Sequence, residues 1–161
     1  MNREQYNRAV DRFSDALYRF VLGLCRSREI AEDVVQDSYM KLWELLSAVD
    51  GDKVKAFLFT TAYRRAIDIL RRERKFADVE SLEERGGTRN PEHVDLQQVL
   101  NAALDALPTV QRTIVLLRDY EGYSYKEIAE ITGVAENNVK VYLFRARVAM
   151  KTSIGSPDKV V

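Results

Sequence analysis

Residues 124–147 have the sequence Ser124-Tyr-Lys-Glu-Ile-Ala-Glu-Ile-Thr-Gly-Val-Ala-Glu-Asn-Asn-Val-Lys-Val-Tyr-Leu-Phe-Arg-Ala-Arg147, which predicts two helices joined by a tight turn. Ser124 and Glu127 form an S-x-x-E capping box that begins the first helix. Gly133 can adopt the positive φ that ends a helix and turns the chain. The apolar seam between the helices consists of Ile128, Ile131, Val134, Val139 and Leu143. This pattern indicates a helix-turn-helix.

The second helix of this segment turns amide, basic and aromatic side chains outward, which suits a major groove and its phosphates. These outward residues are Glu136, Asn137, Asn138, Lys140, Val141, Tyr142, Phe144 and Arg145. DNA is therefore the first partner to consider, and Asn137, Asn138 and Lys140 are the candidates for reading its sequence. For this segment alone, an ordinary pair of packed helices remains the alternative, because helical hairpins that contain glycine are common.

The composition limits the classes of protein to which the chain can belong. Of the 161 residues, 46% are apolar and 31% are charged, as in a globular protein with a charged surface. The formal net charge is zero, so any contact with DNA must come from local patches. No apolar run approaches the ~18 residues of a membrane span, and no signal peptide is present. We therefore expect a cytoplasmic protein without membrane insertion, and a buried structural thiol at the single cysteine, Cys25.

Helical periodicity dominates on both sides of one segment that is poor in apolar residues, which predicts an all-α protein. Phe76–Asp95 contains two glycines, a proline and six acidic residues against two arginines, as expected for a flexible acidic linker. Three helices are predicted before it, and four, including the helix-turn-helix, after it. The expected organisation is a domain at 1–76, a linker at 77–94, a second domain at 95–154 and a tail at 155–161.

Two basic patches stand out against the neutral total, one on each side of the linker. The first consists of Arg64, Arg65, Arg71, Arg72, Arg74 and Lys75, and the second of Lys140, Arg145, Arg147 and Lys151. A solvated helix face is the alternative for either patch alone. Together they favour a DNA that both domains contact, because neutralised phosphates give affinity without sequence information.

The helix predicted at about 29–46 carries the opposite charge. Glu29, Asp33 and Asp37 lie at i, i+4 and i+8 on one face. A solvated face, a protein partner with basic helices and a carboxylate metal site all fit this row. A metal site needs further ligands, and the only histidine, His93, lies in the linker. The inward face of this helix is predicted to consist of Ile30, Val34, Trp43, and Met40 or Tyr39.

With these features assembled, the chain resembles bacterial sigma factors of the extracytoplasmic-function (ECF) group. The block Ala31-Glu-Asp-Val-Val-Gln-Asp-Ser-Tyr-Met-Lys-Leu-Trp-Glu44 is similar to the family's core-polymerase-binding helix. Lys55–Lys75 is similar to its promoter-melting helix. Ala106-Leu-Pro-x-x-Gln-Arg112, together with the helix-turn-helix, is similar to its domain four. The blocks occur in the family's order and cover nearly the whole chain outside the linker.

The resemblance implies a sigma domain two formed by a three-helix bundle and a sigma domain four formed by four helices. It implies docking on the clamp helices of the large catalytic subunit of core RNA polymerase, through Asp33, Gln36, Asp37 and Lys41. It also implies contact with promoter DNA, and the loop at 47–55 is expected to help hold a flipped-out base of the minus-ten element. The expected DNA-binding residues are Arg64, Arg65, Arg71, Arg72, Arg74, Lys75, Asn137, Asn138, Lys140, Tyr142, Arg145 and Arg147.

The function implied is transcription initiation, in which domain two melts and reads the minus-ten element and domain four reads the minus-thirty-five element. An anti-sigma factor is a further expected partner, whereas no catalytic residue, cofactor or metal is expected. Two alternatives remain: a helix-turn-helix regulator that acts without polymerase, and a carboxylate-metal enzyme built on the acidic helix. The chain departs from the family at Ala135, where a capping serine is usual, and at Val141 and Tyr142, where small polar and basic residues are frequent.

Overall fold

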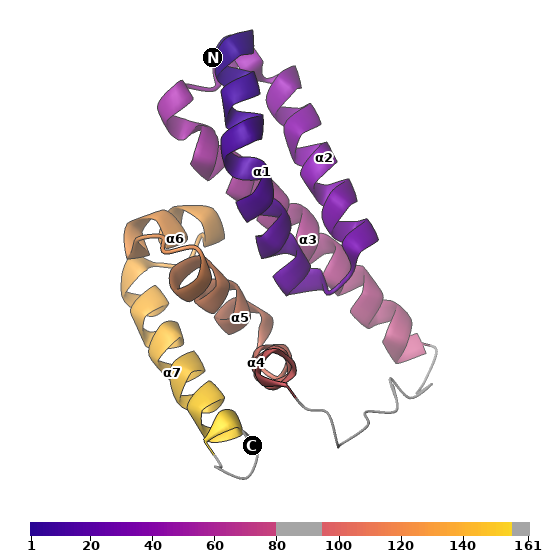
Figure 1. The fold of residues 1–161 in the computed structure, drawn as a ribbon, viewed down its shortest axis with the longest axis vertical. Helices are drawn as coiled ribbons and strands as arrows, with labels where there is room; N and C mark the ends of the chain where they lie inside the picture. The colour runs from indigo at the N-terminus through magenta and orange to yellow at the C-terminus, as the bar shows by residue number, and fades with distance from the viewer. Residues whose placement is uncertain (80–94, 156–161) are drawn as a thin grey trace.

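The computed structural model describes residues 1–79 and 95–155, and these residues form helices, turns and short loops without any strand (Figure 1). The predicted all-α class is therefore confirmed. Residues 80–94, which contain most of the predicted linker and His93, lie outside the described residues, as do 156–161 of the predicted tail. Within the described ranges, no helix is both long and apolar enough to span a membrane.

The first half of the chain is a three-helix bundle. It consists of α1 (Arg3–Cys25), α2 (Arg28–Glu44) and α3 (Val54–Val79), with two 3-10 turns, Leu46–Ala48 and Gly51–Lys53, between α2 and α3. The helix α3 includes residues 77–79, the first three residues of the predicted linker. The bundle forms because apolar residues recur on α1 at three- and four-residue steps, and this stripe packs against α2 and α3.

The inward face of α2 differs from the prediction. Tyr39 is buried at 8% exposure, so of the two alternatives at this position it is Tyr39, and not Met40, that faces inward. The expectation for Trp43 is wrong, because its side chain is 50% exposed and Leu42 is fully buried in its place. The buried row advances from Val34 through Ser38 to Leu42 in steps of four, which turns Trp43 away from the core. The Trp43 ring lies edge-on to Tyr6, with 5.1 Å between their centroids.

The second half contains α4 (Leu96–Asp105), α5 (Thr109–Val115) with a π-helical turn (Leu116–Tyr120), α6 (Tyr125–Thr132) and α7 (Glu136–Ile154). The last two helices form the predicted helix-turn-helix. Ser124 and Glu127 make both hydrogen bonds of the capping box, each 3.1 Å long. Gly133 ends α6 with a φ of 75°. Of the predicted seam, Ile128, Ile131, Val139 and Leu143 are buried, and Val134 is half-buried against the same core.

The helix α7 begins without a side-chain cap, since Ala135 at its N-cap has no hydrogen-bonding side chain. We expect Ala135→Ser to raise the free energy of unfolding by about 1 kcal/mol, because a serine oxygen can accept a backbone N–H of the first turn. Urea unfolding followed by circular dichroism measures this change. The control Ala149→Ser, at an exposed position inside α7, is expected to lower stability by about 0.5 kcal/mol. Equal effects of the two substitutions would show that capping is not involved.

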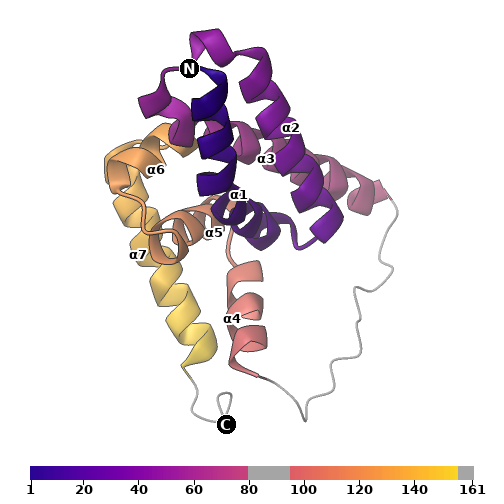
Figure 2. The ribbon, with the colours of Figure 1, turned by 45° about the horizontal axis from the view of Figure 1, so that its top comes forward.

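The two halves pack against each other, with α6 against α3 and α5 against α1 (Figure 2). Phe59 of α3 links them, because its ring stacks on Phe20 at 5.6 Å and meets Tyr123 edge-on at 5.1 Å. At a second point, a Cβ on Gly23 would lie 2.9 Å from a methyl group of Leu116, so the absence of a side chain on α1 lets the π-helical turn approach closely. One cluster of buried residues therefore extends through both halves.

Ion pairs surround this contact between the halves. Arg19 is paired with Glu121 at 2.7 Å, and the Glu121 side chain is only 2% exposed. Arg26 is paired with Asp105 at 2.9 Å. Lys55 is paired with Glu127 and also lies 4.2 Å from the centre of the Tyr123 ring. The hydrogen bond from Lys55 is the main cause of a lowered pKa at Glu127. The Lys55–Glu127 pair joins α3 to α6, and the other two pairs join the region around α1 to the second half.

Cys25 lies at the end of α1 near both halves, and its thiol is predicted to react slowly. Burial, assisted by the negative charge of Glu73 and opposed by Arg112, raises its pKa from 9.0 to about 11. Because only the thiolate is nucleophilic, we expect alkylation by iodoacetamide at pH 8 to be about a hundredfold slower than for the unfolded chain. The rate should keep rising with pH up to about 11. Mass spectrometry of the alkylated chain measures it, and a plateau already at pH 9 would contradict the predicted burial.

Candidate nucleic-acid interface

The basic face of α3 contains arginines that no other described residue neutralises. Arg64, Arg71, Arg74 and Lys75 are all exposed, and none forms an ion pair with a residue that the structure describes. Arg64 and Arg71 are two helical turns apart and therefore lie on the same face of α3. Their guanidinium groups are available to an external anion such as a phosphate.

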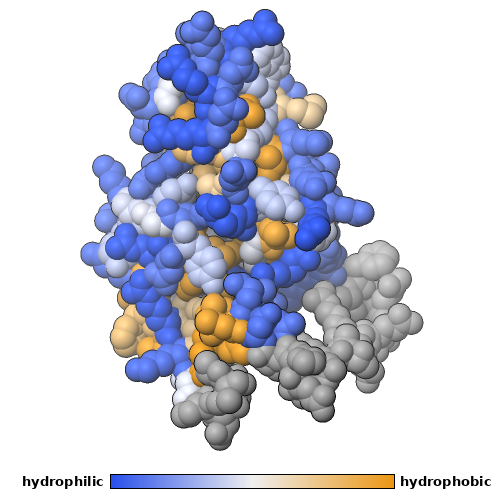
Figure 3. Space-filling model, in the orientation of Figure 1, coloured by the Kyte–Doolittle hydropathy of each residue, from blue (hydrophilic) through white to orange (hydrophobic). Residues whose placement is uncertain are grey.

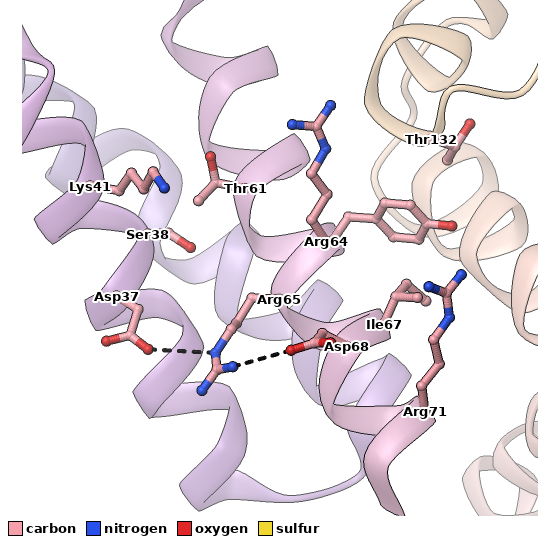
Figure 4. A pocket seen from close by; sticks show the side chains of 11 residues that line it. Asp37, Ser38, Lys41, Thr61, Arg64, Arg65, Ile67, Asp68, Arg71 and Thr132 are labelled. Carbon is pink, nitrogen blue, oxygen red and sulfur yellow. Dashed lines mark ion pairs between the residues drawn. The ribbon is translucent and has the colours of Figure 1, made fainter. Parts of the chain in front are cut away.

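Two other predicted DNA-binding residues of α3 are engaged within the fold. Arg65 lies between Asp37 of α2, at 3.8 Å, and Asp68, at 3.6 Å. Arg72 is paired with the same Asp68 at 3.2 Å. Figure 4 shows Arg65 directed toward the two aspartates, whereas Arg64 and Arg71 extend away from them. The basic patch is thus divided into residues without an ion-pair partner among the described residues and residues paired with Asp37 or Asp68.

An open hollow of about 650 Å³ lies where α2, α3 and the end of α6 meet (Figure 4). Its lining brings together residues predicted to bind polymerase and residues predicted to bind DNA. The lining includes Asp37 and Lys41 of α2, Arg64, Arg65 and Arg71 of α3, and Thr132 of α6. The carboxylate of Asp37 is the link between the two groups, because it contacts Arg65.

The outer face of α2 is acidic in its first half and apolar in its second. The predicted polymerase-binding residues Asp33, Gln36, Asp37 and Lys41 are all exposed. Met40, at 61% exposure, and Trp43 continue the exposed surface toward the end of the helix. No group of three or more potential metal ligands gathers in the described part of the chain. The outer face of α2 thus combines exposed carboxylates with exposed apolar side chains.

The outward face of α7 has three kinds of predicted DNA-binding residue. Asn137, Asn138, Lys140 and Arg145 are exposed. Tyr142 is only half-exposed and packs against the core, so it contributes less to the outer surface than the sequence predicted. Arg147 is bonded to Asp119 through two nitrogens, at 2.5 and 3.2 Å, and this bond raises the pKa of Arg147. The predicted residues that remain exposed thus run from the first turn of α7 to Arg145 in its middle.

Sequence reasoning missed the side chains that join the two halves. Lys55, in the loop expected to hold a flipped-out base, instead contacts Glu127 and the Tyr123 ring. A contact within the second half was also missed, since Lys140 of α7 lies 5.5 Å from the centre of the Tyr125 ring of α6. No short-range pattern connects Lys55 with Glu127, because the partners belong to separate helices far apart in the sequence.

Comparisons with known proteins match each half of the chain to a separate family profile. The family profile described as Sigma-70 region 2 matches residues 9–76, and the profile described as Sigma-70, region 4 matches residues 97–150. The ECF RNA polymerase sigma factor SigM of Bacillus subtilis is 30% identical over 145 residues, covering 86% of this chain and 88% of SigM. RNA polymerase sigma factor SigV of the same species is 33% identical over 144 residues, covering 88% of this chain and 86% of SigV.

A solved structure has the same arrangement of helices. It is the sigma factor RpoE from Bartonella quintana, in complex with the anti-sigma factor NepR, and its sequence is 27% identical to this chain. The TM-score is 0.77, and the match covers 96% of this chain and 99% of RpoE. Identity with SigM and SigV over most of their length, together with both sigma regions in order, determines the family. This chain belongs to the ECF RNA polymerase sigma factors.

Proposed function

We propose that this ECF sigma factor docks on core RNA polymerase through the outer face of α2 and contacts promoter DNA through α3 and α7. Its role is to direct the polymerase to specific promoters. The observation that supports these residue assignments is the pairing of the charged side chains. Arg64 and Arg71 on α3, and Arg145 on α7, have no ion-pair partner among the described residues, whereas Arg65 and Arg147 do.

Residues 1–76 act, in this proposal, as sigma domain two, and residues 95–154 as sigma domain four. Asp33, Gln36, Asp37 and Lys41 of α2 contact the clamp helices of the large catalytic subunit. The exposed Met40 and Trp43 extend that contact with apolar surface. Because burying such aromatic and methionine side chains stabilises protein interfaces, the apolar part is expected to contribute most of the affinity.

The basic face of α3 then holds the backbone of the minus-ten element, while α7 enters the major groove of the minus-thirty-five element. Opening the duplex and flipping a base cost a few kcal/mol, which contacts to phosphates and stacked bases offset. This work is binding and not bond chemistry, so we propose that the chain is not an enzyme. We place it in the cytoplasm, where bacterial RNA polymerase acts.

An anti-sigma factor is a further partner in this proposal. RpoE of Bartonella quintana is bound to the anti-sigma factor NepR in its structure. The exposed apolar surface of this chain gives such a partner places to bind, and Figure 3 shows apolar residues at the surface over α4 and α7. Leu96 of α4, at 59% exposure, is one large apolar side chain exposed in this part of the chain.

Transcription with purified core polymerase and genomic DNA fragments tests the function. We expect transcripts with defined start sites only when both the chain and core polymerase are present. The absence of any chain-dependent start site would contradict the proposal. Tight binding of the isolated chain to one DNA site, steeply weakened by salt, would instead favour a regulator that acts without polymerase.

A further inference from the structure

The outermost face of α7 contains apolar side chains where a DNA-reading helix would be expected to be polar. Val141 is 44% exposed, and Phe144, at 70%, is the most exposed large apolar residue in the described part of the chain. Val148, one turn further, is 49% exposed. They lie opposite the buried Val139 and Leu143, in line with Asn137 at steps of four, three and four. This row contributes nothing to the core, so its apolar character needs another explanation.

The surroundings of the row are cationic. Within α7 the only acidic residue is Glu136, in the first turn, and every later charged residue is basic. Lys140 and Arg145 flank Val141 and Phe144, and both are exposed. A cationic margin around an apolar strip matches the major groove, in which phosphates border base edges that carry the thymine C5-methyl groups. A protein partner would have to bring acidic residues to the same margin.

Helix geometry decides which members of the row can reach the bases. The N-terminal residues of a recognition helix contact base edges, and the major groove is about 12 Å wide. At a rise of 1.5 Å per residue, Val141 lies about 7 Å and Phe144 about 12 Å along α7 from Glu136. Val148 lies about 18 Å along it, beyond the groove. With α7 in a major groove, Asn137 and Val141 would therefore be within reach of the bases, Phe144 at the margin of the groove and Val148 beyond it.

We propose that Val141 is a specificity-determining residue of this sigma factor, reading the C5-methyl group of a thymine in the minus-thirty-five element. Phe144 covers the same methyl group from the side, and Asn137 contacts a neighbouring adenine through its N6 and N7 atoms. This inference rests on the proposed function, because it requires α7 to lie in the major groove. The inference goes beyond the proposed function because it names the chemical group that selects the promoter.

The test replaces thymine with deoxyuracil, which keeps base pairing and removes only the C5-methyl group. Duplexes bound by the complex of this chain with core polymerase are first selected from a library randomised across the minus-thirty-five window. Each thymine of the selected sequence is then replaced singly, and binding is measured by competition. Burial of one methyl group corresponds to about fourfold in affinity, so one replacement is expected to weaken binding about fourfold.

Two variants with the same substitution locate the contact. Val141→Ser is expected to lose most of the discrimination between the thymine and deoxyuracil duplexes, because the main apolar partner of the methyl group is lost and only the side contact with Phe144 remains. Val148→Ser, on the same exposed face but beyond the groove, is expected to keep the fourfold discrimination. The two chains and the two duplexes form a double-mutant cycle. The difference in discrimination between the unsubstituted chain and Val141→Ser measures the coupling between Val141 and the methyl group, and general effects of serine on the helix cancel.

Several results would overturn the inference. They are a selected sequence without thymine, equal binding of both duplexes by the unsubstituted chain, or unchanged discrimination in Val141→Ser. Promoter selection that persists in these cases leaves the proposed function intact and assigns the apolar row to a protein partner. A failure to enrich any duplex with core polymerase contradicts the proposed function itself and, with it, the inference.

Discussion

Neutralising Arg64 and Arg71 together is expected to weaken promoter binding by the complex of this chain with core polymerase by roughly tenfold to a hundredfold. Both side chains lie on the exposed face of α3, and neither is neutralised by a described residue. In the variant Arg64→Gln, Arg71→Gln, two phosphate contacts are lost while the length and polarity of the side chains are nearly kept. The loss should be similar for different promoter sequences, because phosphate contacts carry no sequence information.

The salt dependence of binding distinguishes this mechanism from a general defect. Each lost phosphate contact should lower the slope of log affinity against log salt by about 1, and the double variant by about 2. The control is Arg3→Gln, Arg8→Gln on α1, which changes the net charge equally at exposed positions. It should leave affinity and slope unchanged. An unchanged slope in the α3 variant would exclude phosphate contact by these two arginines.

Phe59→Ala is expected to lower the free energy of unfolding by about 3–5 kcal/mol, the range for large core residues. The Phe59 side chain is fully buried, stacks on Phe20 of α1 and meets Tyr123 of the second half. Truncation therefore removes apolar contacts in both halves at once. Because whole domains are stable by only about 5–15 kcal/mol, a large share of the stability is lost.

Urea unfolding measures this effect with two probes. Far-ultraviolet circular dichroism follows all helices, whereas fluorescence of the only tryptophan, Trp43, follows the first half. In the unsubstituted chain both probes should give the same midpoint, because one buried cluster extends through both halves. Phe144→Ala makes the same substitution at a side chain that is 70% exposed and should change stability by less than about 0.5 kcal/mol. Separate midpoints in the unsubstituted chain would contradict a shared core.

Features set by short-range interactions could be predicted from the sequence. The capping box of Ser124 and Glu127 and the positive φ of Gly133 each depend on residues within one turn. The missing cap at Ala135 was visible for the same reason. The inward face of α2 was harder, because apolar residues lie on both of its faces. A shift of one residue moves a side chain by about 100° around the helix, and this placed Trp43 outside.

Features set by packing between helices could not be predicted. The spacing of Arg65 and Asp68 on one helix is visible in the sequence, but the contact of Arg65 with Asp37 of α2 is not. Arg147 bonds to a residue 28 positions away, and Arg19 to one 102 positions away. Such pairs depend on how helices that are separate in the sequence pack on one another, which no local pattern encodes. Which basic residues are paired across helices, and which remain unpaired, could therefore be learned only from the structure.

The most direct test of the account is promoter melting, followed by a fluorescent base in the minus-ten element while the concentration of core polymerase is raised. We predict that Asp33→Lys gives a weaker melting signal than the unsubstituted chain at low polymerase concentration. The full signal should return at high polymerase concentration, because α2 acts in the assembly of the chain with core polymerase. The Arg64→Gln, Arg71→Gln variant should stay defective at every polymerase concentration, because α3 acts on DNA. Rescue of the α3 variant by polymerase, failure to rescue the α2 variant, or no chain-dependent signal at all would contradict the account.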